Sequence, residues 1–316
     1  MKFDGCIVSD WDGIDYLSED YQEAVALAVN AGIDMFMVSE NWKGFINQAK
    51  RNVLRGSISS KRIDDAVRRI LIVKYACGLF EKPRPSERYW AKHESFGSQE
   101  HRRLAREAVR KSLVLLKNQD AMLPLGKESR VFVAGKNAHN RGHQCGGFTI
   151  DLQGTCGNEV IEGGTSIWEG IRQAAPLAEL STGVCGADAD PDRHDVAIVV
   201  IGEEPYAEGP GDIRSGEHVI VEAGSQINGS FNVLNPYGKT LELATLHPED
   251  LETIHTIYTK GIPVITVLVS GRPLVIGKEL EKSMAFVAAW LPGSEGRGVA
   301  DLLLGDFDFQ GRLSFS

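Results

Sequence analysis

The first 80 residues alternate between short apolar runs and segments with helical spacing. Nearly continuous apolar runs occupy 5–9 and 33–38, and apolar positions recur every three to four residues over 17–31, 43–54 and 62–71. Continuous apolar runs are typical of buried parallel strands, whereas spacings of three and four are typical of amphipathic helices. This part of the chain therefore predicts two strand–helix units, too few strands to bury a core by themselves.

A second series of elements follows a break in the pattern. Residues 81–98 are rich in proline and polar side chains without periodicity, which predicts a linker, and a helix is predicted over 99–117. Beyond this 81–125 region, apolar strands are predicted at 130–134, 195–202, 264–270 and 285–290, with helices at 164–174 and 248–260. Their alternation predicts an α/β domain with a mainly parallel sheet over 126–316. Residues 216–244 alternate with period two around glycines, which predicts a β-rich insertion of one or two hairpins.

Composition narrows the class of protein. The 316 residues are 42% hydrophobic and 24% charged, as in an ordinary globular protein. With 34 basic and 43 acidic residues the net charge is −9, which disfavours binding to the phosphates of nucleic acids. No run approaches the ~20 apolar residues of a membrane helix, and the first ten residues lack the apolar core of a signal peptide. We therefore expect a cytoplasmic protein that binds neither nucleic acid nor membrane.

The cysteine and histidine patterns indicate no metal site. The five cysteines are scattered, without the CxxC or Cys/His spacing of a zinc site, and reduced, buried thiols are expected. P-loop, GxSxG and HExxH motifs are also absent, so we expect neither metal nor cofactor. His143 lies two residues before Cys145, but no third group that would orient a Cys/His nucleophile accompanies them.

Carboxylates remain as candidates where predicted strands end. Asp10 follows the run 5–9 and precedes Trp11, and a carboxylate beside an indole suits a sugar site, since the ring can cover the apolar face of a pyranose. A simple turn carboxylate ahead of Gly13 would explain the same residues. The segment 202–212 carries four further carboxylates after a strand, and it fits either an active-site loop or a solvated acidic turn: Glu203, Glu204, Glu208 and Asp212.

Longer stretches of the sequence resemble those of a known enzyme family, and together they cover nearly the whole chain apart from 216–244. They include GCIVSDWDGID (5–15), QCGGFTIDLQG (144–154), GEEPYAEGPGD (202–212), VITVLVSGRPLVI (264–276) and WLPGSEGRGVADLLLGDFDFQGRL (290–313). In these stretches the chain resembles the C-terminal half of glycoside hydrolase family 3 enzymes of the bacterial exo-β-glucanase and β-glucosidase kind. The resemblance implies the last two strands and helices of a (β/α)8-type barrel over 1–80, followed by an α/β sandwich domain. About six barrel strands that precede this region in the family are missing from the chain.

The resemblance also implies roles for single residues. Asp10 of the SDW motif corresponds to the nucleophile and Trp11 to a wall of the aglycone subsite. Glu208, in the EPYAE segment, corresponds to the acid/base, with Tyr206 as a further substrate contact. Phe148 stands where the family usually has tryptophan, which changes the second aromatic wall.

Three functions stay open from the sequence. The first is retaining hydrolysis of β-glucosides, weakened because the residues that grip the nonreducing sugar lie in the missing strands. The second is hydrolysis of activated esters or lactams, and the third is a catalytically silent sugar-binding fragment. We expect a small-molecule or oligosaccharide substrate. Because two bare strands expose apolar edges, we also expect a homo-oligomer. The resemblance allows a periplasmic or secreted location for longer relatives.

Overall fold

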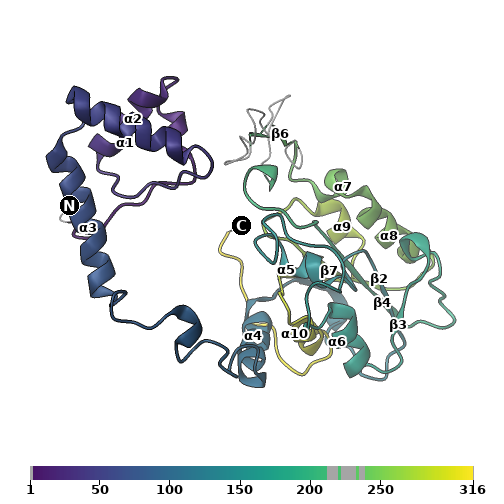
Figure 1. The fold of residues 1–316 in the computed structure, drawn as a ribbon. Coiled ribbons are helices and arrows are strands. Elements are labelled where there is room, and N and C mark those ends of the chain that lie inside the picture. The colour runs from purple at the N-terminus through teal and green to yellow at the C-terminus, as the bar shows by residue number, and fades with distance from the viewer. Residues whose placement is uncertain (1–2, 212–219, 222–232, 235–238, 316) are drawn as a thin grey trace. The chain divides into compact units, whose positions relative to one another are not determined.

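The computed structural model describes residues 3–211, 220–221, 233–234 and 239–315. The chain divides into two compact units (Figure 1). Unit 1 comprises Met1–His93 with Val219–Asn235, and unit 2 comprises Glu94–His218 with Pro236–Ser316. The division falls inside the region 81–125 expected to hold a linker and a connecting helix.

Unit 1 consists of helices beside two extended segments. Its helices are α1 (Tyr21–Ala31), α2 (Trp42–Arg55) and α3 (Ser60–Ala76), with short 3-10 turns η1 (Gly13–Tyr16) and η2 (Pro85–Glu87). Asp20 begins α1 and Ser59 begins α3, each accepting a hydrogen bond from a backbone N–H of the first turn. A small core joins α1 to the segments around it: Ile14, Val25, Ala28, Val29 and Ile58.

The two strands predicted at 5–9 and 33–38 do not form a ladder. Both segments are extended, but they meet in one isolated parallel bridge between Val8 and Met35. In the described part of unit 1 these two segments pair only with each other, and a parallel strand needs neighbours to extend its ladder. Ile7 and Val8 are therefore left 44% and 46% exposed.

Arg62 and Asp34 tie the extended segments to the helices. The Arg62 guanidinium donates to Asp34 Oδ1 at 2.6 Å, and Asp34 Oδ2 accepts from the Ile7 N–H at 2.9 Å. Arg62 also donates to the carbonyl of Val29 at the end of α1. The Asp34 side chain is 1% exposed, so a buried ion pair connects α3, α1 and both segments.

Unit 2 contains a sheet covered by helices on both faces (Figure 1). Among the described residues six strands form this sheet in the order β1-β8-β7-β4-β2-β3, parallel except for the antiparallel edge strand β1. The strands are β1 (Val114–Asn118), β2 (Val131–Ala134), β3 (Glu179–Leu180), β4 (Val196–Gly202), β7 (Val264–Val269) and β8 (Ala285–Trp290). The helices are α4 (Gln99–Ser112), α5 (Arg141–Cys145), α6 (Ile167–Ala174), α7 (Leu243–Leu246), α8 (Pro248–Thr259), α9 (Gly277–Glu281) and α10 (Arg297–Leu303), with 3-10 turns η3 (Gln119–Ala121), η4 (Val184–Gly186) and η5 (Gly209–Gly211).

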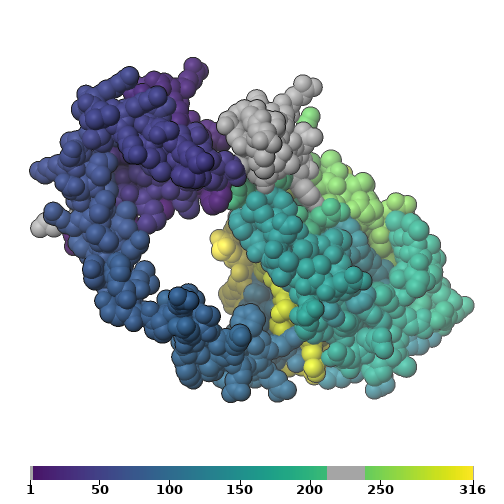
Figure 2. Space-filling view, in the orientation of Figure 1, coloured from purple at the N-terminus to yellow at the C-terminus, as the bar shows by residue number. Residues whose placement is uncertain are grey.

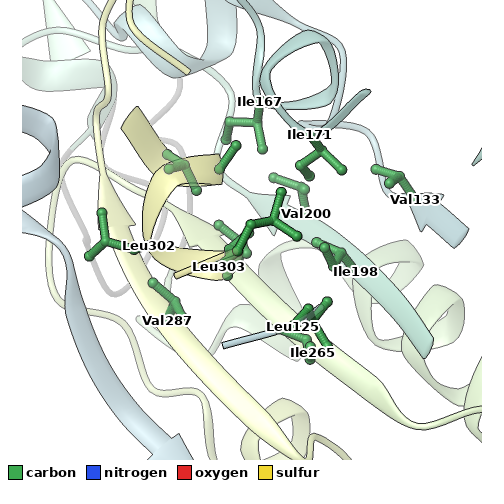
Figure 3. Close-up of a cluster of buried hydrophobic side chains, with 14 of the residues drawn as sticks. Leu125, Val133, Ile167, Ile171, Ile198, Val200, Ile265, Val287, Leu302 and Leu303 are labelled. Atoms are coloured by element: carbon green, nitrogen blue, oxygen red, sulfur yellow. The ribbon is translucent and has the colours of Figure 1, made fainter. Parts of the chain in front are cut away.

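Alternate residues of the central strands build two separate cores. On β4, Ile198 and Val200 pack toward α6 and α10 with Ile167, Ile171 and Leu303 (Figure 3). The neighbouring positions Ala197, Val199 and Ile201 pack on the opposite face with Ile254 and Ile257 of α8. Every residue of β4 is buried, as expected for a parallel strand between two helical layers. The predicted α/β class with a mainly parallel sheet is confirmed.

The helix predicted over 99–117 is wrong at its end. α4 stops at Ser112, and Val114–Asn118 form the edge strand β1, which pairs with β8. The local pattern carries no glycine or proline at this point, so nothing in it ends the helix. The β-branched and leucine side chains of this segment are instead drawn into the sheet by a partner far away in the sequence.

The end of β8 and the residues after α10 contact the last turns of α4. The Trp290 indole N–H donates to the Ser112 carbonyl, and the Arg110 guanidinium lies over the ring of Phe307 at 5.1 Å. In Figure 2 this C-terminal stretch, in yellow, is visible within the body of unit 2. Of the insertion predicted at 216–244, β5 (Ile220–Val221) and β6 (Val233–Leu234) pair antiparallel, and 216–219, 222–232 and 235–238 lie outside the described residues.

Candidate active site

Asp10 ends the first extended segment of unit 1 with its side chain exposed. Ser9, which is buried, fixes the backbone there: its N–H donates to the Met35 carbonyl, and its hydroxyl accepts from the Met37 N–H at 2.8 Å and donates to the Asp10 carbonyl. The Asp10 carboxylate accepts from the Trp11 N–H at 2.7 Å. The Trp11 side chain is 49% exposed beside it. The SDW segment thus presents a carboxylate and an indole to solvent from a fixed backbone.

Asp12 has a different task in the same turn. Its φ of +48° places it in the left-handed region, and its carboxylate accepts from the Ser39 N–H at 3.0 Å and the Ser39 hydroxyl at 2.5 Å. Asp12 therefore fastens the turn to the end of the second extended segment. Because this structural role is filled by Asp12, the Asp10 carboxylate is not needed to hold the turn.

Unit 2 has a pocket of about 210 Å³ where loops meet at the carboxyl ends of its parallel strands. One loop, here named the aromatic loop, is 146–154, which follows β2 and α5. The second, the acidic loop, is 203–211, which follows β4. Residues after β7 complete the wall, and the lining includes Phe148, Glu203, Tyr206 and Ser270. Crevices at this edge of open α/β sheets are the usual ligand sites of such folds.

Two glycines allow these loops to form. A Cβ at Gly202, where φ is +145°, would lie 1.8 Å from the Val269 carbonyl oxygen, so only glycine lets β4 end against β7. A Cβ at Gly147 would lie 2.1 Å from the carbonyl oxygen of Tyr206. The aromatic loop therefore touches the acidic loop backbone to backbone.

Arg272 clasps the acidic loop at both ends. Its guanidinium donates twice to Glu203 Oε1, at 2.8 and 2.7 Å, and also donates to the Gly211 carbonyl. The Tyr206 hydroxyl donates to Glu203 Oε2 at 3.0 Å, and Arg272 lies 4.7 Å from the centre of the Tyr206 ring. Glu203 is 3% exposed. Glu203 thus holds the loop from inside the protein. Tyr206 lines the pocket, and its contacts with Glu203 and Arg272 fix its ring.

Glu208 lies at the exposed turn of this clasped loop. Its φ is +53°, an uncommon conformation for a residue other than glycine, and its carbonyl accepts from the Gly211 N–H. The Gln153 side chain holds the preceding Ala207 N–H at 2.9 Å. Within the described residues, no hydrogen bond or ion pair engages the Glu208 carboxylate. Asp212, the last acid of the predicted site segment, lies outside the described residues.

Phe148 projects from the aromatic loop with its side chain 69% exposed and φ at +57°. The backbone N–H of Phe148 donates to the Leu152 carbonyl, and this hydrogen bond closes the loop into a tight turn. The structure therefore brings Phe148 and Tyr206 together at one pocket of unit 2, and Asp10 and Trp11 together at one turn of unit 1.

Two clusters of side chains near this pocket were missed in the sequence. His143 Nε2 lies 3.3 Å from the Cys156 sulfur, whereas Cys145, its neighbour in sequence, is not its partner. Burial lowers the pKa of His143 and raises the pKa of Cys145. The second cluster joins Lys136 to Asp250 at the start of α8. No spacing in the sequence signals either cluster, because each unites different loops.

The described residues hold no group of three or more His, Cys, Asp or Glu side chains that could bind a metal ion. A search of their helices for one both long and apolar enough to cross a bilayer finds none.

Comparison with known proteins places these loops in a wider context. The sequence pattern of the Glycosyl hydrolase family 3 C-terminal domain matches residues 113–316, and that of the Glycosyl hydrolase family 3 N terminal domain matches residues 1–73. Among curated proteins, the chain is 30% identical to a lysosomal beta glucosidase of Dictyostelium discoideum and 29% identical to a periplasmic beta-glucosidase of Salmonella typhimurium, with 99% of the chain aligned to each. It spans 38% and 42% of the length of these relatives.

Solved structures agree with these matches. An exo-1,3/1,4-beta-glucanase from a Pseudoalteromonas species is 42% identical with a TM-score of 0.85, over 99% of this chain and 37% of that one. A mutant beta-glucosidase from Listeria innocua, in complex with laminaribiose, is 27% identical with a TM-score of 0.76, over 96% of this chain and 39% of that one.

Proposed function

Because the chain belongs to glycosyl hydrolase family 3, we propose that it is a hydrolase that cleaves β-linked glucosides with retention of configuration. Asp10 acts as the nucleophile and Glu208 as the general acid and base. The observation that carries the proposal is the Glu208 carboxylate, which no described residue engages, on a loop fixed at both ends by Arg272. The carboxylates of Glu203, in the loop of Glu208, and of Asp12, in the turn of Asp10, instead hold their own loops through hydrogen bonds.

The two exposed carboxylates divide the reaction between them. Asp10 attacks the anomeric carbon while Glu208 gives its proton to the leaving oxygen, which forms a covalent glycosyl-enzyme. Glu208, now ionised, then takes a proton from water, and the resulting attack releases the sugar and frees Asp10. A general acid must exchange protons with its substrate. The Glu208 carboxylate suits this role because no described residue forms a hydrogen bond or an ion pair with it.

Exposed aromatic side chains provide surfaces on which a sugar substrate can bind. Trp11 beside Asp10 and Phe148 at the unit 2 pocket are both exposed, and aromatic rings stack on the apolar faces of pyranoses. The relatives named as beta-glucosidases and as an exo-1,3/1,4-beta-glucanase favour β-linked glucosides and short gluco-oligosaccharides as substrates. We propose further that the chain acts as a homo-oligomer.

Hydrolysis of nitrophenyl β-glucoside by purified protein tests this function. Asp10→Ala should abolish turnover, and Glu208→Ala should lower it by about 10²–10⁴-fold, the usual share of acid–base catalysis. The Glu208 variant should lose less with dinitrophenyl glucoside, because that leaving group hardly needs a proton. Glu252→Ala, an exposed acid on α8, serves as the matched control and should retain activity.

Labelling identifies the nucleophile directly. A 2-fluoro-glucoside with a good leaving group should leave a sugar on the peptide that contains Asp10, detected by mass spectrometry. Nitrophenyl acetate is assayed on the same preparation. Ester turnover that survives in both variants, with no glucoside turnover and no label, would reject the glycosidase proposal in favour of the esterase alternative.

A further inference from the structure

At its end β4 extends beyond its ladder with β2, and only one backbone hydrogen bond among the described residues continues on that side, from the Asn137 N–H to the Val200 carbonyl at 3.3 Å. The ladder between the two strands ends at the pair Ala134–Val199, while β4 continues to Gly202. Side chains take over from there: Asp250 Oδ2 accepts from the Gly202 N–H at 3.0 Å, and Asn137 Nδ2 donates to the Glu203 carbonyl at 3.2 Å. At the start of the acidic loop, side chains therefore hold the Gly202 N–H and the Glu203 carbonyl, while the Glu203 N–H donates to the Val269 carbonyl of β7 at 3.0 Å.

Asp250 is placed for this contact by α8. It lies in the first turn of the helix and is 1% exposed. An ionised carboxylate accepts a hydrogen bond about twice as strongly as a neutral group, so the charge of Asp250 affects how firmly Gly202 is held. A buried N–H without any acceptor is destabilising, because the loss of its hydrogen bond to water is not offset, so the loop depends on this side chain.

Lys136 is the cation that faces Asp250. Its ammonium lies 3.4 Å from Asp250 Oδ2, 2.5 Å from Glu249 Oε1 and 2.7 Å from His247 Nδ1. It comes from the loop after β2, so it connects that loop to α8. β4 itself adds no titratable side chain, and the thiol of Cys185 from η4 lines the same pocket of about 280 Å³ as Lys136, Glu249 and Asp250.

The balance of these groups places the titration of Asp250 near neutrality. Burial raises the pKa of Asp250 to about 7, against the opposing effects of Lys136 and the Gly202 N–H, and Glu249 raises it further. Burial, followed by the charge of Lys136, lowers the pKa of His247. Two more distant effects join them: the charge of Glu204 raises the pKa of both His143 and His247, and His247 lowers the pKa of His143.

We propose that Asp250 is a positioning residue for the acidic loop, whose seating through the Gly202 N–H follows the protonation state of Asp250 and its contact with Lys136. Its consequence for catalysis rests on the proposed function, since it acts through the loop that carries Glu208. Ionised Asp250 holds Gly202 and Lys136 together. Once protonated, it loses the attraction to Lys136 and becomes a weaker acceptor, so the loop is held less firmly at acid pH.

The amide resonance of Gly202 in the intact chain tests the seating without any substrate. In a pH titration between 5 and 9 by ¹H–¹⁵N NMR, its proton should move upfield on acidification with a midpoint near 7. In Asp250→Asn, which keeps an acceptor oxygen but cannot ionise, this transition should vanish. Two further variants fix the sign: Lys136→Gln should raise the midpoint, because a cation is lost, and Glu249→Gln should lower it, because a neighbouring anion is lost.

Glu249→Gln is also the matched control for charge. This change removes the acid next to Asp250, which contacts Lys136 but not the acidic loop. The titration of the Gly202 amide must therefore persist in this variant. A Gly202 amide that does not titrate in the wild-type chain, or that titrates unchanged in Asp250→Asn, overturns the proposal. This test needs no variant to fold, because the wild-type titration alone can refute it.

The pH profile of kcat for nitrophenyl β-glucoside then tests the link to catalysis. The wild type should lose kcat, with little change in KM, as pH falls through the midpoint of the Gly202 titration, and Asp250→Asn should lack this limb. An identical limb in both proteins would show that Asp250 does not act through the loop. If no protein turns over glucoside while Gly202 titrates as expected, the seating is supported and the proposed function is the part that fails.

Discussion

Replacing Arg272 by methionine should destabilise unit 2 far more than the loss of an ordinary surface charge. The Arg272 and Glu203 side chains are 16% and 2% exposed and share two hydrogen bonds. Among the described residues, the variant leaves this buried carboxylate with the Tyr206 hydroxyl as its remaining hydrogen-bond donor. Breaking a buried ion pair in this way costs about 3–5 kcal/mol. The Gly211 carbonyl loses its donor as well, so the acidic loop opens at both ends.

Hydrogen exchange of the β4 amides measures this cost within unit 2 alone. Since each 1.4 kcal/mol is a factor of ten, amides of β4 should exchange about 10²–10⁴-fold faster in Arg272→Met. Arg193→Met is the matched control: it breaks an ion pair with Glu179 whose side chains are 59% and 49% exposed, and pairs of this kind contribute little to stability because water screens them.

A double-mutant cycle separates the buried charge from the lost packing. Adding Glu203→Gln to Arg272→Met removes the stranded charge, so the double variant should be more stable than the sum of the single changes predicts. Additive effects, or an exchange rate in Arg272→Met within threefold of that in Arg193→Met, would refute the reasoning that Arg272 clasps a buried carboxylate.

Two further changes test unit 1. Arg62→Met should destabilise this unit by about 3–5 kcal/mol, because Asp34 is left buried without its cation, and exchange should accelerate in α1 while β4 is unaffected; equal acceleration in both would contradict independent units. Light scattering should give a mass of at least two chains, since apolar side chains such as Ile7 (44%) and Ile72 (52%) are exposed in the single chain, and a monodisperse monomer would disprove self-association.

Local pattern was sufficient where a strand is buried on both faces. The apolar runs at 195–202, 264–270 and 285–290 became β4, β7 and β8 within one residue at each end. Their flanking turn residues mark the ends, and their helices cover both sides as the alternation implies. The α/β class therefore follows from composition and order alone.

Elements that depend on distant partners were out of reach of local pattern. β1 continues the apolar spacing of α4 and becomes a strand only because β8 accepts it. The segments at 5–9 and 33–38 have strand-like sequences, but among the described residues they form a single isolated bridge with each other. A segment with a strand-like sequence therefore forms a regular strand only where neighbouring strands are available to pair with it.

The roles of the acidic residues in the candidate site also depend on partners that are distant in the sequence. A sequence can place four acids in one loop, but it cannot tell which is an anchor. Glu203 is committed by Arg272, which lies 69 residues later in the chain, and this leaves Glu208 as the exposed acid. Asp250 escaped notice for the same reason, because its contact with Gly202 joins residues 48 apart.

The pairing of β1 with β8 also determines when unit 2 can be completed during synthesis. β1 is the first strand of the sheet to leave the ribosome, and its partner is the last. Until about 170 further residues have emerged, Val114–Asn118 have no partner strand and the apolar side chains of this segment have no core. Such long-range closure slows folding and prolongs exposure of apolar segments to aggregation, so we expect nascent chains of this protein to rely on chaperones until β8 is released.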